Sequence, residues 1–308
     1  MNSLSFSKIA NLTEEQARKY LESIRWSNSI ICPHCKNEGA YELKPVKNGN
    51  RPLKKGVYKC KNKNCKKLFT VTVGTIFEGS HVPLNKWLTA ISLVCSSKKG
   101  ISAHQLHRML GITYKSAWFL EHRIRFAMND ENKISEKLSG IVEADETYIG
   151  GKGKGKRGRG SVKKTPVFTL VERNGRVRST VIEKVTAKNL KSILYDNVEN
   201  NSIIMTDEFR SYWGLGKKFK EHNVVEHGKK EYSRGNVHVN TAEGYFGILK
   251  RGINGVYQHV SKHHLKKYLY EFDFRFTLRK LLDSECTIIA IKGFEGKRLM
   301  YRDSSRVV

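Results

Sequence analysis

The chain has 308 residues, which is enough for two or three domains and at least one sizeable hydrophobic core. Its formal net charge of +28 favours a polyanionic partner, either nucleic acid or, as the weaker alternative, a membrane surface. The sequence has no run of about 18 apolar residues, which argues against a transmembrane helix, and its first residues lack a secretory signal pattern. We therefore expect an intracellular protein.

The first expected helix covers residues 12–25. It opens with Thr13-Glu-Glu-Gln16, a capping-box pattern, and apolar residues follow at helical spacing.

Four cysteines then lie close together in the sequence. The first pair is in CPHC and the second pair, after a gap of 24 residues, is in CKNKNC. Two cysteine pairs on tight turns can place four thiolates around Zn²⁺, and short strands expected at 41–43, 57–59 and 68–73 would complete a zinc ribbon. The alternative is two unrelated turns with reduced cysteines, since the second pair and the gap are longer than usual. The expected ligands are Cys32, Cys35, Cys60 and Cys65.

Residues 1–80 are thus assigned to an N-terminal helix and zinc ribbon, and residues 81–130 to a helix-turn-helix. The expected helices span 84–96, 102–110 and 114–128. Gly111 permits the turn before the last helix and Thr113 can cap that helix. Lys115 and Ser116 would then face a DNA major groove, with Trp118 or His122 as further candidates. A three-helix bundle that only packs is the alternative.

From Gly140 the pattern changes to strands, and residues 138–282 are expected to form an α/β domain. The expected strands are 141–148, 167–172, 176–185, 202–206 and 223–225, and the main helices are 186–198, 241–251 and 262–282. Asn174-Gly175 is a hairpin signal between the second and third strands. This element order is that of the RNase H fold, in which the first and fourth strands and a late helix bring polar ends together. The fold class is therefore multidomain α+β, with residues 283–308 as a C-terminal tail.

A basic segment, Gly150–Lys164, separates the first two strands of that domain. It holds seven basic residues and no acid, and its frequent glycines disfavour regular structure and let backbone N–H groups approach phosphate. We expect an arm that becomes ordered on DNA, with a solvated hairpin insertion as the alternative. The candidate DNA contacts of the arm are Lys152, Lys154, Lys156, Arg157 and Arg159.

Three acids are candidates for a catalytic metal site. Asp145 and Asp207 each follow an apolar strand, and Glu243 begins a helix on which Lys250 lies seven residues, or about two turns, later. Carboxylate oxygens suit Mg²⁺, and two ions roughly 3.5–4 Å apart can activate a nucleophile and stabilise the leaving 3′ oxygen of a phosphodiester. Strand alternation turns Glu146 away from the face of Asp145. A chance arrangement on an inert scaffold is the alternative.

These motifs resemble those of the DDE transposases of bacterial insertion sequences with an N-terminal zinc ribbon, which are related to the eukaryotic Merlin elements. The similar segments, within about residues 25 to 280, are CPHC with CKNKNC, VGTIFEGSHVPLNKW, EADETYIGGK, MTDEFRSYWGL and HVNTAEGYFGILKRG. The resemblance implies an RNase H-like domain, Mg²⁺ or Mn²⁺, and catalytic roles for Asp145 and Asp207. Some members are described as using Asn as the third ligand, so Asn240 is a second candidate beside Glu243. Arg251, near the end of the last of these segments, is a further candidate DNA contact.

The resemblance also implies a reaction and its partners. The ribbon and the helix-turn-helix would bind terminal inverted repeats in double-stranded DNA, water would cut the strand, and the freed 3′-OH would attack target DNA. Two element ends in one complex require a homodimer or higher oligomer, expected in the bacterial cytoplasm at the nucleoid and not at a membrane. Two other functions stay open: a metal-dependent nuclease or resolvase that cleaves without joining, and a DNA-binding regulator with an inert RNase H-like domain.

Overall fold

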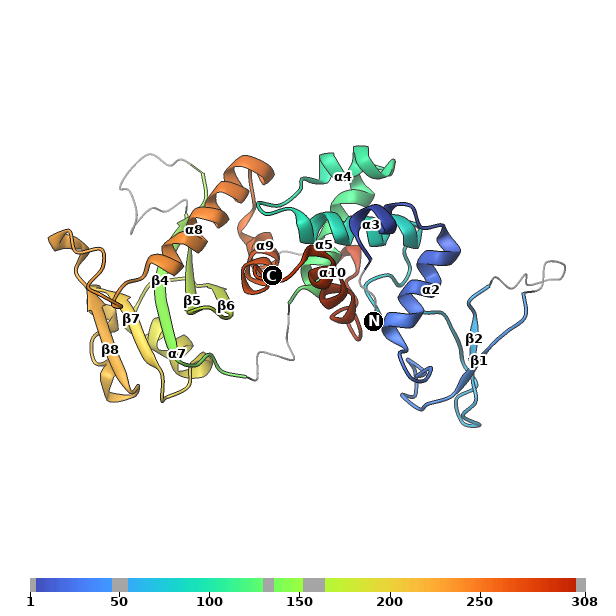
Figure 1. The fold of residues 1–308 in the computed structure, drawn as a ribbon, viewed down its shortest axis with the longest axis horizontal. Helices are drawn as coiled ribbons and strands as arrows, with labels where there is room; N and C mark the ends of the chain where they lie inside the picture. Colours follow the sequence, from blue (N-terminus) through green and yellow to red (C-terminus); the bar gives the residue numbers. More distant parts are fainter. Residues whose placement is uncertain (1–3, 46–54, 130–135, 152–163, 303–308) are drawn as a thin grey trace. The chain divides into compact units, whose positions relative to one another are not determined.

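The computed structural model describes residues 4–45, 55–129, 136–151 and 164–302 (Figure 1). The described residues fall into two compact units. The first consists of 4–97, 103–128 and 281–302, and the second of 98–102 and the described part of 129–280. The five candidate contacts of the basic arm, from Lys152 to Arg159, lie outside the described residues.

The first unit is mainly helical. Its helices are α1 (Phe6–Ala10), α2 (Glu14–Arg25), α3 (Leu84–Ser96), α4 (Ala103–Leu110), α5 (Tyr114–Ala127) and α10 (Asp283–Lys292). α3 is the central helix, since α1, α2 and α10 all pack against it and most of its residues are buried. The predicted capping box of α2 is confirmed: Gln16 N donates to Thr13 Oγ1, and Thr13 N donates to Gln16 Oε1.

A carboxylate from α2 holds the start of α3. α3 has no side-chain cap of its own, and Glu14 accepts the backbone N–H groups of Leu84 at 2.9 Å and Asn85 at 3.1 Å. These are two of the N–H groups that a helix leaves without internal partners at its first turn, where a negative charge also suits the helix dipole.

The zinc-ribbon segment forms a small sheet with the order β1-β2-β3. Its strands are β1 (Ala40–Glu42), β2 (Tyr58–Cys60) and β3 (Leu68–Phe69), all antiparallel. Trp26 closes one side of this sheet, with ring centroids 5.0 Å from Tyr58 and 6.0 Å from Phe69. Among the described residues of this segment, the buried core consists of Cys32, Tyr58, Cys60 and Phe69.

The three helices predicted for the helix-turn-helix are confirmed, and α4 packs against α5. Gly111 in the turn has a φ of +58°, and Thr113 caps α5 by accepting the N–H of Ser116. Lys115 is exposed, as a DNA contact must be. The suggestion that His122 faces a groove is wrong, because this side chain is fully buried and its ring lies 4.1 Å from that of Trp118.

The second unit is built on a five-stranded mixed sheet. Its strands are β4 (Ile141–Ile149), β5 (Thr165–Glu172), β6 (Val177–Val181), β7 (Ile203–Asp207) and β8 (Glu221–Val225), and its helices are α7 (Ala187–Asn197), α8 (Asn240–Gly252) and α9 (Lys262–Thr277). The sheet order is β6-β5-β4-β7-β8. β4, β5 and β6 are antiparallel neighbours. β7 runs parallel to β4, and β8 runs parallel to β7. This is the RNase H-like arrangement expected from the sequence.

The helices cover both faces of that sheet (Figure 1). On one face, Val142 and Ala144 of β4 pack with Leu190 and Leu194 of α7. On the other, Ile149 and strand β5 pack with α8 and α9. Gly252 ends α8, and it must be glycine because a Cβ there would collide with the ring of Phe272 in α9.

Three elements end at least four residues earlier than the sequence pattern predicts. β3 stops at Phe69 rather than 73, and the chain then turns, with Val73 N donating to Thr70 O. β6 stops at Val181 rather than 185, because its partner beyond Val167 is Pro166, which has no N–H to continue the ladder. α9 stops at Thr277 rather than 282, where Arg279 Nη1 donates to the Phe276 carbonyl and satisfies one of the last acceptors of the helix.

The division of the chain into domains at 80, 130, 138 and 282 stays a prediction. Among the described residues, the segment after 283 contains α10, which packs against α2 and α3 in the first unit. None of the helices in the described part of the chain is both long and apolar enough to cross a membrane.

Candidate functional site

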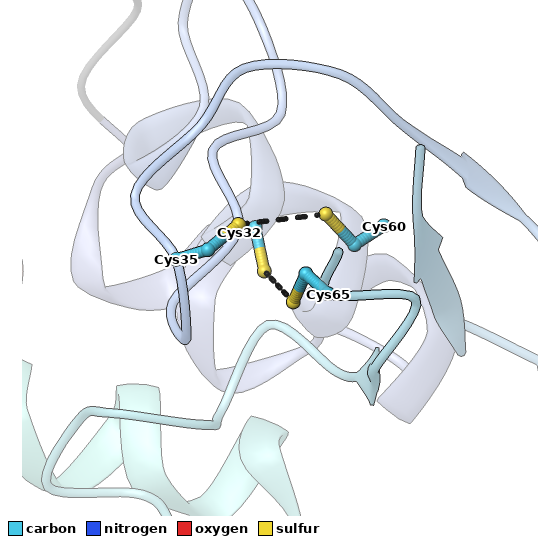
Figure 2. A group of neighbouring side chains, drawn as sticks. All are labelled: Cys32, Cys35, Cys60 and Cys65. Atoms are coloured by element: carbon cyan, nitrogen blue, oxygen red, sulfur yellow. Dashed lines mark hydrogen bonds between the residues drawn. The ribbon is translucent and has the colours of Figure 1, made fainter. Parts of the chain in front are cut away.

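The four predicted zinc ligands meet in the first unit (Figure 2). Their sulfur atoms all lie within 4.8 Å of one another, with 3.8 Å between the Sγ atoms of Cys32 and Cys65 and 3.6 Å between those of Cys35 and Cys60. Four sulfurs placed tetrahedrally at about 2.3 Å from a zinc ion lie about 3.8 Å apart. The cluster therefore fits Zn²⁺ in both ligand type and spacing.

The turns around the cysteines explain why the second pair is longer than the first. Lys36 and Lys66 each follow a cysteine and have φ values of +61° and +49°. Lys36 N donates to Cys32 O, whereas Lys66 N donates to Asn62 O. Asn62 thus takes the place in the second turn that Cys32 has in the first, and the ligand Cys60 stands two residues earlier, at the end of β2.

The cysteines differ in how readily they ionise. A hydrogen bond from the backbone N–H of Asn37 lowers the pKa of Cys35 to about 7, whereas burial raises the pKa of Cys60 to about 12. Zinc needs thiolates as ligands, so binding displaces protons from this cluster, and zinc affinity must rise with pH.

The two aspartates come from adjacent parallel strands of the second unit. β4 and β7 pair from Ile141 and Ile203 as far as Glu143 and Met205, and the same register would set Asp145 level with Asp207. Asp207 ends β7. Asp145 lies inside β4, as the predicted strand 141–148 implied, and the antiparallel partner β5 holds β4 to Ile149. Asp145 stands two residues beyond the last residue of β4 that pairs with β7.

Helix α8 carries the other candidates. Asn240 is its first residue and Glu243 lies one turn later, and both are exposed. The Oε1 atom of Glu243 lies 3.9 Å from Nε2 of His227. Burial lowers the pKa of Lys250, while the charge of Asp145 raises it and that of Lys164 lowers it, so both charges act at Lys250.

Several acidic side chains act together on Asp145. Burial raises the pKa of this carboxyl to about 8, and the charges of Glu146, Asp207 and Glu243 act in the same direction. Such a cluster binds a cation favourably, because positive charge relieves both the repulsion between carboxylates and the penalty of burying them. The acid oxygens are not gathered as tightly as the sulfurs, since among the described residues only the cysteines form a potential ligand set within 4.8 Å.

Three further acids lie beside the candidates but serve as hydrogen-bond acceptors for the scaffold. Glu146 accepts the hydroxyl of the buried Tyr212 at 2.6 Å, so its carboxylate turns to the α7 face, as strand alternation predicted. Glu208 accepts the N–H groups of His227 and Gly228. Sequence reasoning missed the third, Glu143, which is fully buried and accepts two N–H groups from the start of α8. Only the period-2 spacing of Glu143 and Asp145 in EADE hinted at a shared face.

The other predicted DNA contacts are described only in part. Lys115 is exposed on α5 with its Nζ atom 4.8 Å from the ring centroid of Tyr301, and Ser116 is half-buried in the cap of the same helix. Arg251 is exposed near the end of α8. These positions stay predictions as DNA contacts.

Comparison with known proteins identifies the family. A relative from Halobacterium salinarum, described as an uncharacterized protein in transposable element ISH50, is 31% identical over 282 residues, which is 86% of this chain and 91% of that protein. The family model described as the ISXO2-like transposase domain matches residues 137–277, and the model described as the transposase zinc-ribbon domain matches residues 12–68. The chain belongs to the ISXO2-like transposases.

The two matched regions contain both candidate sites: the transposase domain contains all three acids and Lys250, and the zinc-ribbon domain contains the four cysteines. The transposase also has a weak likeness to solved structures. A pre-cleavage Mos1 transpososome aligns over 65% of this chain and 73% of that chain, at 14% identity and a TM-score of 0.27. A Mos1 mariner paired-end complex with Mn aligns over 63% and 75%, at 13% identity and a TM-score of 0.21.

Proposed function

We propose that this transposase binds the terminal inverted repeats of its own element, cuts the DNA there by hydrolysis and joins the freed 3′ ends to target DNA. The observation that carries the proposal is the arrangement around Asp145. Asp207 arrives from the neighbouring parallel strand, and the charges of Asp207 and Glu243 both reach the Asp145 carboxyl, whose pKa is raised to about 8. Clustered carboxylates that repel one another are what a divalent cation stabilises.

Each residue has a distinct task in the proposed reaction. Asp145 and Asp207 would hold Mg²⁺ or Mn²⁺, with Glu243 as the third ligand and Asn240 as the second candidate for that place. Two bound ions would supply activation of the attacking oxygen and stabilisation of the leaving 3′ oxygen. Lys250, whose pKa burial lowers and the charge of Asp145 raises, would bind a non-bridging phosphate oxygen through its ammonium group.

The two steps use the same site with different attacking groups. In the first, a water oxygen bonds to the phosphorus at the element end and the bond to the 3′ oxygen breaks, which leaves a 3′-OH. In the second, that 3′ oxygen bonds to a target phosphorus and a target 3′ oxygen leaves. Both steps are single displacements at phosphorus, so no covalent intermediate with the protein is needed.

Recognition would come from the first unit and from the basic arm. We assign the zinc ribbon, with Zn²⁺ on its four cysteines, and the α4–α5 segment to the element end, with Lys115 and Ser116 toward the bases. Because two ends must meet before joining, the active species would be a homodimer or higher oligomer. The place of action would be the cytoplasm, at the host DNA.

The test is a joining assay on the DNA that flanks this gene. The zinc-loaded protein, Mg²⁺, a pre-cut duplex carrying the flanking inverted repeat and a circular target should give joined product when the duplex ends in 3′-OH. The same duplex ending in 3′-deoxyribose should give none, because it lacks the attacking group. Cleavage of uncut ends without any joining would favour the nuclease, and specific binding without cleavage would favour the inert regulator.

Neutralising the basic arm should weaken binding to all DNA sequences alike. Replacing Lys152, Lys154, Lys156, Arg157 and Arg159 by glutamine should reduce the slope of log affinity against log salt by up to about 4.5, since each phosphate contact contributes about 0.9. Fluorescence anisotropy with specific and unrelated duplexes at several salt concentrations measures this slope.

A matched control for the arm removes the same number of charges from other exposed lysines of the second unit. These are Lys184, Lys188, Lys217, Lys218 and Lys220. The slope in this control should change by less than half as much. Equal slopes for the wild type and the arm variant would mean that the arm does not touch DNA.

A further inference from the structure

Glu143 is a buried carboxylate that the proposed reaction does not use. It lies on β4 with no exposed surface, and it shares the strand face of Asp145, two residues later. An ionised carboxylate in such a place is destabilising unless several donors compensate it. The hydrogen-bond donors that surround Glu143 therefore indicate which part of the structure it stabilises.

The donors to Glu143 come from the beginning of α8. Oε2 accepts the N–H groups of Thr241 at 2.8 Å and Ala242 at 3.0 Å, and Oε1 accepts the Thr241 hydroxyl at 2.9 Å. α8 has no side-chain cap from its own flanking residue, Val239. The strand thus supplies the cap that the helix lacks, and its negative charge lies at the positive end of the helix dipole.

Arg173 extends this contact to the segment before the helix. Its Nε donates to Oε1 of Glu143 at 2.7 Å, while Nη1 donates to Asn236 O and Nη2 to His238 O. Nδ1 of His238 also lies 3.3 Å from the same carboxylate oxygen. Glu143 and Arg173 together fix both the approach to α8 and its first turn.

Glu143 links the strand that carries Asp145 to the helix turn that carries Glu243. Asp145 is two residues, about 7 Å, along the strand from Glu143, and Glu243 directly follows Ala242, whose N–H Glu143 accepts. We propose, on the basis of the proposed function, that Glu143 is a positioning residue that sets where Glu243 stands relative to Asp145 and thereby tunes divalent-cation affinity. It touches neither cation nor DNA.

The test uses Mn²⁺ binding to the full-length, zinc-loaded protein and DNA cleavage in Mn²⁺. In Glu143→Gln, the amide group cannot accept all of these donors, and α8 gains freedom to move. We expect the half-saturating Mn²⁺ concentration to rise about tenfold or more, as for other residues that orient metal ligands. The cleavage rate at saturating Mn²⁺ should stay within about threefold of the wild type. A merely structural role would lower the active fraction and leave the half-saturating concentration unchanged.

Glu14→Gln is the matched control, because Glu14 caps α3 in the same way in the other unit. It should lower the melting temperature without changing Mn²⁺ affinity. If Glu143→Gln does not fold, Thr241→Val removes only the hydroxyl contact and should weaken Mn²⁺ binding about threefold.

Two results would overturn the inference, and they are distinguishable. Wild-type Mn²⁺ affinity in a folded Glu143→Gln variant, or in Thr241→Val where Glu143→Gln does not fold, would remove the positioning role and leave the proposed function intact. Mn²⁺ binding by the wild type that is insensitive to Asp145→Asn would remove the proposed function itself, and the inference with it.

Discussion

Asp145→Asn and Asp207→Asn should each abolish strand cleavage in Mg²⁺ while leaving specific DNA binding within a few-fold of the wild type. The amide keeps the shape of each side chain but removes the charge and the oxygen that would bind a cation. Loss of about 4 kcal/mol of transition-state stabilisation corresponds to about a thousandfold in rate. Single-turnover cleavage of a labelled element end, measured beside a gel-shift titration, separates the two effects.

The stability of the same variants provides an internal check on folding. The folded-state pKa of Asp145 is about 8, above the value of about 3.9 for an unfolded chain, so the folded state binds its proton more tightly. Ionisation of this group therefore reduces stability as the pH rises from about 4 to about 8. Without divalent cation at pH 8, Asp145→Asn should unfold at an equal or higher temperature than the wild type. Asp196→Asn, at an exposed acid on α7, should change neither cleavage nor stability appreciably.

Two substitutions on α8 distinguish Glu243 from Asn240 as the third ligand of the catalytic cation. Glu243→Gln should be as inactive as the aspartate variants, because the Glu243 charge reaches Asp145, whereas Asn240→Ala should retain substantial cleavage. Lys250→Ala should lose less activity than Glu243→Gln, since it positions phosphate without binding a cation. Normal cleavage by Glu243→Gln together with an inactive Asn240→Ala would give the role to Asn240 instead.

The order of strands and helices in the second unit could be predicted from the sequence, because each element has a clear local signal. Apolar runs marked β4 and β7, the Asn174-Gly175 turn marked a hairpin, and helical spacing marked α7 and α8. The ends of elements depend on partners that local patterns do not contain. β5 begins at Thr165 rather than 167 because it pairs with β4 as far as Ile149, and β6 stops at Val181 rather than 185 because Pro166 offers no N–H.

The same distinction separates the site residues that were predicted from those that were missed. Asp145, Asp207 and Glu243 were found because each marks the end of an apolar run or the start of a helix. Glu143 was missed because its significance lies in donors about 100 residues later in the chain, at Thr241 and Ala242. His122 was misplaced because a polar side chain at a helix surface position gave no sign that other residues cover it.

Removing zinc should unfold the ribbon selectively. In the part of the ribbon that the structure describes, the buried core is Tyr58, Phe69 and two of the ligands themselves. A core this small cannot keep a segment folded without a metal or disulfides. Structural zinc contributes on the order of 10 kcal/mol or more to such folds. Cys32→Ser or Cys60→Ser should therefore lose the single zinc per chain, expose residues near Tyr58 to protease, and reduce binding to the element end at least tenfold.

Metal analysis, limited proteolysis and fluorescence anisotropy measure these three effects. The control is Cys95→Ser, at a buried cysteine of α3, which should retain both zinc and DNA binding. A folded, reduced wild-type protein that contains no zinc and resists protease in the ribbon would show that packing alone holds these turns together.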